Sequence, residues 1–329
     1  MKFKKVLLSF AIFITVSTGL ALAEKTSVKG LNRYKLDNGL EVFIQEDHTV
    51  PLAYVEIAVR AGGVTQTPET AGLFHLYEHM MFAGNRLYKD SAASSKAMAD
   101  MGVTSHNGVT SSDMVRYFFT IPSYSLEQGL AYWNAAIRTP LIEENEFENE
   151  KKVVLSEIEG DKANPAYVNY KYMQLSLFPD QPWKTDVGGS YDIVRNATLA
   201  QMREMQRTYY IPCNAALFIG GDVNPDRTIE LVKTIYGTWS NNGMSRPGKE
   251  QQLEPRPLTQ TKYAVMPYEK LPEQAAHIYM AWRGPDCEFA KNEINTAEYL
   301  SYILNKPDSE MNTILPENPE QPSFQSVFF

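Results

Sequence analysis

Cysteine is scarce in this sequence: Cys213 and Cys287 are the only two among 329 residues. Two cysteines allow at most one intramolecular bridge, which excludes a disulfide-built scaffold. We expect the two residues to lie in different domains. One bridge in an oxidising compartment and two free thiols therefore both stay open as interpretations.

Long apolar runs are also scarce, and the only candidate lies at the N-terminus. Lysines at positions 2, 4 and 5 precede a mostly apolar run, Val6–Leu20, and Ala21-Leu22-Ala23 then leads into Glu24. This order is typical of a secretory signal peptide covering residues 1–23, whereas a membrane anchor would need a longer run. We expect export to the periplasm or the exterior, with no membrane attachment after cleavage because no cysteine near Glu24 could carry a lipid.

Basic residues are outnumbered, with 31 lysines and arginines against 39 acidic residues and a net charge of −8. Without residues 1–23 the balance becomes 28 against 39, a net charge of −11. A nucleic-acid partner is therefore not expected. The chain is 43% hydrophobic and 12% aromatic, so it can bury one large core or two ordinary ones.

The hydrophobic pattern predicts alternating strands and helices up to about residue 240. Strands are expected at 40–44, 53–59, 103–107, 114–121 and 214–219, and helices from Gly72 and at 94–101, 126–138, 144–162, 166–178, 199–210 and 225–236. The expected fold class is α+β, with a mixed, largely antiparallel sheet covered by helices.

A break follows this first domain, which we assign to residues 24–240. Residues 241–261 are polar, with three prolines and two glycines, and are predicted to form a linker. Strands at 262–267 and 274–282 and a helix at 288–304 would then begin an incomplete repeat of a similar domain, 262–329. Four prolines from Pro307 onward predict an irregular tail from residue 305.

Histidine is rare as well, yet two of the five histidines stand in the string His75-Leu76-Tyr77-Glu78-His79. Residues four apart share one face of a helix, so His75 and His79 can both face one metal ion, with Glu78 beside it. The order H-x-x-E-H inverts the H-E-x-x-H zinc motif. The string predicts a zinc site with its own general base, and the alternative is a histidine pair on a helix surface.

The helix expected at 144–162 offers a third ligand. Phe147, Val154 and Ile158 define an apolar arc on it, and Glu150 and Glu157 fall inside this arc. A carboxylate in apolar surroundings must be paired or bound to a metal. Glu157 is therefore the predicted ligand and Glu150 a partner that orients a histidine. The alternative is that both are solvated glutamates at the edge of the helix.

Four motifs together resemble the pitrilysin/insulysin family of zinc metallopeptidases, which includes the mitochondrial processing peptidase. They are Leu36-Asp37-Asn38-Gly39-Leu40, the segment Gly72–Gly84 that contains the histidines, His106-Asn107-Gly108 with Thr110, and Glu150 with Val153–Glu157. The resemblance extends from about residue 31 to residue 240 and continues weakly to about residue 310.

The resemblance implies a pitrilysin-type zinc metalloendopeptidase domain with one zinc ion on His75, His79 and Glu157 and with Glu78 as the general base. It also implies a peptide or small unfolded protein as substrate, bound as an added strand along the edge at 103–107. Asn107 is then the residue expected to hold the peptide backbone.

Two departures from the family pattern keep other functions open. Gly108 stands where the family usually has alanine, and about 70 residues follow the linker, where the family has a full second domain that supplies an arginine and a tyrosine for the carbonyl oxygen. One alternative is a zinc-binding but catalytically deficient chain that needs a partner subunit to complete the chamber. Another is a non-catalytic interaction protein. Zinc content separates the last from the other two.

Overall fold

The computed structural model describes residues 24–25, 30–181, 184, 186–247, 257–267, 278–285 and 290–309. The chain divides into two compact units, one of residues 1–167 and 180–256 and the other of residues 168–179 and 257–329. The expected signal peptide, Cys287, residues 248–256 of the linker and the tail from residue 310 lie outside the described residues.

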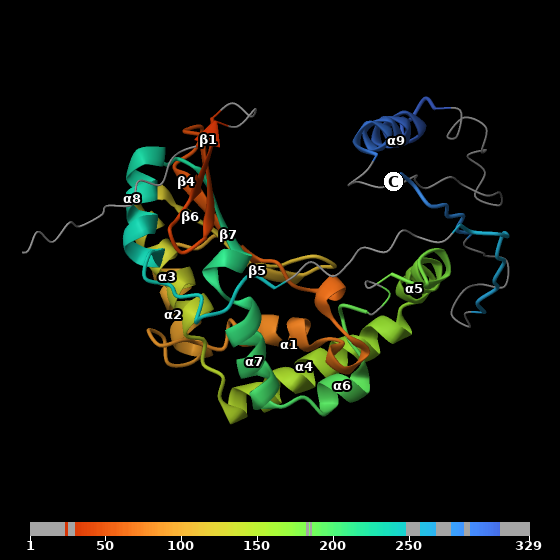
Figure 1. Cartoon of the computed structure of the whole chain (residues 1–329), viewed down its shortest axis with the longest axis horizontal. Helices are drawn as coiled ribbons and strands as arrows, with labels where there is room; N and C mark the ends of the chain where they lie inside the picture. Colours follow the sequence, from red (N-terminus) through yellow and green to blue (C-terminus); the bar gives the residue numbers. More distant parts are fainter. Residues whose placement is uncertain are drawn as a thin grey trace, which may run out of the picture. The chain divides into compact units, whose positions relative to one another are not determined.

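The first unit is built on a seven-stranded sheet in the order β1-β2-β3-β7-β4-β6-β5 (Figure 1). Only the β3–β7 pair is parallel, and the other five pairs of neighbours are antiparallel. The prediction of a mixed, largely antiparallel sheet is confirmed. The strands are β1 (Glu24–Lys25), β2 (Leu31–Lys35), β3 (Glu41–Glu46), β4 (Leu52–Val59), β5 (Ser105–Thr110), β6 (Val115–Pro122) and β7 (Ala215–Gly221).

Helices lie against this sheet and below its β5 end. Figure 1 shows α8 and α3 beside the strands, with α1, α4, α6 and α7 gathered under β5. The helices of this unit are α1 (Leu73–Met80), α2 (Ser91–Asp100), α3 (Leu126–Arg138), α4 (Glu144–Ala163), α6 (Tyr191–Arg195), α7 (Leu199–Tyr209) and α8 (Pro225–Tyr236). Short 3-10 turns are found at Gly63–Thr65, Pro68–Thr70, Ser123–Ser125 and Pro212–Asn214.

The core lies between one face of the sheet and the helices. On β6 the side chains of Val115, Tyr117, Phe119 and Ile121 are buried, whereas those between them are half-buried, as a pleated strand with one covered face requires. Trp133 of α3 stacks on Phe119 with ring centroids 5.0 Å apart. Burial of each such side chain contributes roughly 1.5–3 kcal/mol, so the sheet is a firm support for the segments attached to it.

Most of the predicted elements in this unit are confirmed, and α3 and α8 have the predicted bounds. Strand β2 and helix α6 were not predicted. The sequence of β2, Leu-Asn-Arg-Tyr-Lys, is mostly polar because the strand lies near the sheet edge, and α6 has only five residues, too few to show a helical period.

The second unit differs more from expectation. Helix α5 (Pro165–Leu177) straddles the division between the units, and α9 (Lys291–Leu304) confirms the helix predicted at 288–304. The strands predicted at 262–267 and 274–282 are wrong for the described positions 262–267 and 278–282, which form no strand. A strand needs a partner for its backbone groups, and the described residues of this unit contain none.

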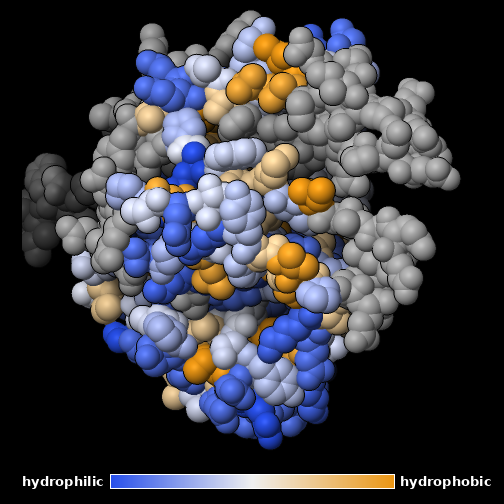
Figure 2. All heavy atoms as spheres, turned by 90° about the vertical axis from the view of Figure 1, so that its right-hand side faces the viewer, coloured by the Kyte–Doolittle hydropathy of each residue, from blue (hydrophilic) through white to orange (hydrophobic). Residues whose placement is uncertain are grey.

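No helix in the described part of the chain is both long and apolar enough to cross a bilayer. On the face drawn in Figure 2, hydrophobic residues form separate spots among hydrophilic ones. Cys213 is half-buried and carries a free thiol.

Candidate metal centre

Helix α1 is anchored so that one of its faces stays open. Gly72 precedes it with a φ of 90°, and a Cβ there would lie 2.6 Å from the Cα of Gly189, so only glycine lets the two backbones approach this closely. Most of the helix is buried in the core, through Leu73, Phe74, Leu76, Tyr77 and Met80. His75 and His79 are left on the face that turns toward α4.

The two imidazoles and one carboxylate converge. The Nε2 atoms of His75 and His79 are 3.3 Å apart, and the Glu157 Oε2 atom lies 3.3 Å from the first and 3.6 Å from the second. Zinc with bonds of about 2.0–2.2 Å in a tetrahedron separates its ligand atoms by about 3.3–3.6 Å. The three donor atoms therefore have the spacing and the chemistry to hold a zinc ion.

The other ring nitrogen of each histidine has a partner of its own. His79 Nδ1 lies 3.1 Å from Glu150 Oε2, and His75 Nδ1 lies 3.3 Å from the carbonyl oxygen of Gly188. When Nδ1 donates to these acceptors, the lone pair of each Nε2 faces the common point. Glu150 was expected in this role. Gly188 was not, and no local pattern indicates it because it lies in a loop far along the chain.

The electrostatics of the centre suit a cation. Burial alone would lower the pKa of His79, but the hydrogen bond to Glu150 and the negative charges of Glu157 and Glu78 outweigh burial and raise it. The same carboxylates would stabilise a divalent ion placed between the histidines.

Glu78 lies beside the three donor atoms and is held from β5. Only 9% of Glu78 is exposed, and its Oε2 accepts a hydrogen bond of 2.7 Å from the Thr110 hydroxyl. Its Oε1 has no hydrogen-bond donor among the described residues, so this oxygen is available to a water molecule or substrate. The sequence motifs include Thr110 but gave no sign of this contact.

These residues line one pocket of about 550 Å³, which also contains Asn107 and Phe82. Asn107 is exposed on β5, the last strand of the described sheet, and its Oδ1 accepts a hydrogen bond of 3.0 Å from the Gly108 amide. The pocket therefore adjoins an open sheet edge.

The surroundings expected for Glu157 are wrong in one respect. Phe147, Val154 and Ile158 are buried as predicted, but the Glu157 side chain is 48% exposed and faces the open pocket. It lies at the rim of the buried arc of α4, on the side that faces α1 and the pocket. The helical angle was predicted correctly, but an apolar environment was not found.

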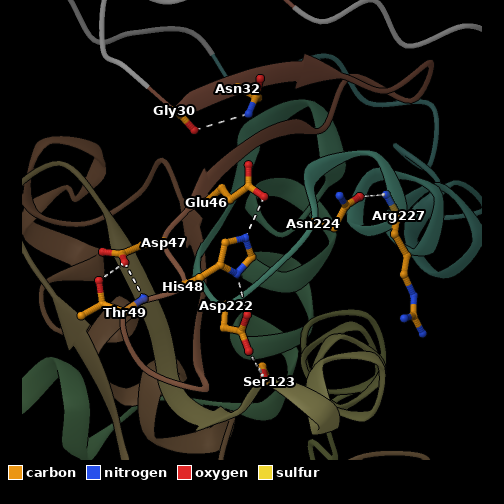
Figure 3. A network of polar contacts seen from close by, with 10 residues as sticks. All are labelled: Gly30, Asn32, Glu46, Asp47, His48, Thr49, Ser123, Asp222, Asn224 and Arg227. Atoms are coloured by element: carbon orange, nitrogen blue, oxygen red, sulfur yellow. Dashed lines mark hydrogen bonds and ion pairs between the residues drawn. The ribbon is translucent and has the colours of Figure 1, made fainter.

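A second polar cluster connects the ends of strands in the same unit (Figure 3). His48 lies between Asp222 and Glu46, with Nδ1 2.6 Å from the first carboxylate and Nε2 2.9 Å from the second, and Ser123 donates to Asp222. These hydrogen bonds raise the pKa of His48 and lower that of Asp222. Among the described residues, His75, His79 and Glu157 alone form a group that could hold a metal ion.

Comparison with known proteins gives a consistent result along most of the chain. Residues 41–183 match the family described as Insulinase (Peptidase family M16), and residues 196–318 match the Peptidase M16 inactive domain. The zinc protease PqqE of Helicobacter pylori is 25% identical over 239 residues, which cover 72% of this chain and 53% of that protein. The insulin-degrading enzyme of Bos taurus is 25% identical over 231 residues, which cover 68% of this chain and 22% of that enzyme.

The fold has a close counterpart among solved structures. The periplasmic protease PqqL of Escherichia coli superimposes with a TM-score of 0.65 at 21% identity, over 71% of this chain and 26% of that one. The chain thus spans about half the length of PqqE and about a quarter or less of the two longer proteins. Its pitrilysin-like fold and the two consecutive matches show that it belongs to the insulinase (M16) peptidase family, with an N-terminal peptidase domain followed by part of the C-terminal M16 domain.

Proposed function

We propose that this chain is a zinc-dependent endopeptidase that holds one zinc ion on His75, His79 and Glu157. The observation that carries the proposal is the convergence of three donor atoms at separations of 3.3, 3.3 and 3.6 Å, which fits a tetrahedral site with one position left open. The zinc proteases among the relatives support the choice of metal.

In this proposal Glu78 is the general base. Bound zinc supplies a Lewis acid that makes water nucleophilic near neutral pH. The Oε1 atom of Glu78 takes the proton of the attacking water and passes it to the leaving amine, while Oε2 stays bonded to Thr110. Glu150 and the Gly188 carbonyl keep both imidazoles turned inward.

The proposed substrate is a peptide or a small unfolded protein. Its backbone pairs with the edge of β5 as an added strand, and Asn107 bonds to that backbone. The open edge of β5 beside the pocket supports this arrangement.

We further propose export to the periplasm or the exterior. The charged, apolar and small-residue order of residues 1–23 supports it. The structural counterpart PqqL is described as periplasmic.

The test compares the native chain with Glu78→Gln and with Glu159→Gln, a matched change on the exposed side of α4. Zinc content is measured by elemental analysis and hydrolysis with an unstructured fluorogenic peptide. Native protein and Glu159→Gln should each bind one zinc ion and cleave the peptide. Glu78→Gln should keep its zinc and lose roughly 10²–10⁴-fold in rate. Equal cleavage by native protein and Glu78→Gln would refute the role of Glu78.

A second candidate is a zinc-binding chain that is catalytically deficient until a partner subunit completes the chamber. It is favoured by the match of residues 196–318 to a domain described as inactive. Stoichiometric zinc without hydrolysis in either the native chain or Glu78→Gln would favour this candidate.

A further inference from the structure

The carboxylate of Glu78 meets strand β5 at two positions on one face. Residues two apart on a strand point the same way, and Gly108 and Thr110 both face α1 from β5. Thr110 donates its hydroxyl hydrogen to Glu78 Oε2 at 2.7 Å. The contact connects the end of β5 with the last turn of α1, and the two residues are 32 positions apart in the sequence.

Gly108 provides the space for this contact. A Cβ at this position would lie 2.5 Å from Glu78 Oε1, which is closer than real Cβ atoms come to other atoms, and 3.0 Å from Glu78 Cγ, which is a tight contact. The φ of Gly108 is not in the left-handed region, so the glycine is needed for room and not for its backbone conformation. With alanine here, the Glu78 carboxylate would have to shift away from the strand.

We infer that β5 positions the general base. The Thr110 hydroxyl holds Glu78 Oε2 by a hydrogen bond, and the lack of a side chain at Gly108 leaves room for the carboxylate next to the strand. The inference rests on the proposed role of Glu78. Thr110 and Gly108 are positioning residues, because they act through Glu78.

The contact with Thr110 determines which carboxylate oxygen of Glu78 is free to act as the base. A glutamate side chain has several rotamers, and a base that must be within hydrogen-bond reach of water gains from being held in one. Thr110 occupies Oε2 and leaves Oε1 to act. Because the proposed substrate pairs with the edge of the same strand, β5 would align both the peptide backbone and the base.

The kinetic experiment replaces the Thr110 hydroxyl by a methyl group and keeps the shape of the side chain. Thr110→Val removes the donor and Thr110→Ser keeps it. The matched control is Thr234→Val, since the Thr234 hydroxyl donates to the Glu230 carbonyl on the exposed side of α8, outside the pocket. Thr110→Val should lower kcat by about 10–100-fold with KM changed less than about twofold and zinc content unchanged. Thr110→Ser should restore most of kcat, and Thr234→Val should match the native chain.

A second measurement does not depend on zinc or on activity. In metal-free protein, Thr110→Val should lower the thermal midpoint by about 2–4 °C, and this loss should disappear when Glu78→Ala has already removed the acceptor. In a crystal structure of metal-free Gly108→Ala, the Glu78 carboxylate should be displaced while β5 keeps its place. Gly220→Ala on β7, where a Cβ meets no atom closer than 3.9 Å, is the matched control.

The two measurements separate this inference from the proposed function. If the native chain cleaves peptide and Thr110→Val keeps full kcat, the inference is refuted and the peptidase assignment stands. If the native chain shows no hydrolysis, the peptidase assignment fails, and the thermal midpoints of the metal-free proteins still test the inference. An equal loss from Thr110→Val in the native protein and in Glu78→Ala would overturn it. A loss found only in the native protein would support it.

Discussion

At the scale of single residues, Glu150 shows how a side chain next to a ligand can tune a metal site. It accepts from His79 Nδ1 at 3.1 Å and so directs Nε2 toward Glu157. Glu150→Gln should lower zinc affinity by about 10–100-fold, because the amide is a weaker acceptor that leaves the ring less well oriented. Competition with a fluorescent chelator measures the change.

The matched control for Glu150 is Glu148→Gln on the same helix. Glu148 pairs with Lys151 at 2.8 Å and does not line the pocket, so its replacement should leave zinc affinity as it is. Equal affinity loss in both variants would mean that general charge on α4, and not the contact with His79, determines zinc binding.

His48 carries a prediction about pH. Its hydrogen bonds to Asp222 and Glu46 raise its pKa above 6.5, so its protonated form stabilises the folded state. This contribution is complete below the unfolded pKa and is lost as pH rises through the folded pKa. His48→Gln should therefore destabilise the protein at about pH 5.5 and have little effect at about pH 9.

Thermal midpoints of the native chain and His48→Gln across this pH range check the prediction. Asp222 determines the acid end of the pH range in which the ion pair stabilises the fold. Its pKa is lowered below 3.8, so its contribution to stability is present above that value and is lost as pH falls through the lowered pKa. A difference between the two proteins that stays constant from acid to alkaline pH would contradict the ion-pair explanation.

At the residue scale, the sequence predicted the positions of side chains around a single helix. The spacing of His75, Glu78 and His79 and the angular positions of Glu150 and Glu157 follow from helical periodicity alone. The partners of Glu78 and His75 on β5 and in the loop at Gly188 could not be predicted, because tertiary folding brings those segments together. The exposure of Glu157 was missed for the same reason.

At the scale of elements, the start of α1 depends on Gly72. Gly72→Ala forces a left-handed conformation on a residue with a Cβ and drives that atom into Gly189. The expected loss is about 2–4 kcal/mol in the free energy of unfolding, measured by urea denaturation.

Gly160, inside α4, is the matched glycine. A Cβ there meets no atom within 4 Å, so Gly160→Ala should raise stability by about 0.5–1 kcal/mol through helix propensity. Similar effects of the two substitutions would show that the Gly72–Gly189 approach does not constrain the fold.

Helices with a regular hydrophobic periodicity could be predicted from the sequence, whereas elements without one could not. Helices α3 and α8 have wide apolar faces, and their bounds matched the predictions. The strands expected at 262–267 and 274–282 are not formed at the described positions 262–267 and 278–282, because a stretch of suitable composition becomes a strand only beside a partner. Strand pairing is a property of the whole sheet, which single-segment patterns do not contain.

At the scale of the whole molecule, zinc binding should stabilise the folded chain, because the three proposed ligands come from two helices. Free zinc at about 100 times its dissociation constant contributes about 2.7 kcal/mol. Calorimetry should therefore show the thermal midpoint rising by about 5–10 °C on zinc addition and falling back with chelator. The double variant His75→Ala/His79→Ala should not respond, and an equal rise in that variant would contradict the proposed site.

The sheet order has a consequence for how the chain acquires its structure. Strand β7 lies between β3 and β4 and pairs with both, although residues 60–214 separate it from β4 in the sequence. Synthesis proceeds from the N-terminus, so the two earlier strands lack their shared neighbour until nearly the entire first unit has emerged. Such a late-closing topology keeps a newly made polypeptide loose until its seventh strand has been added.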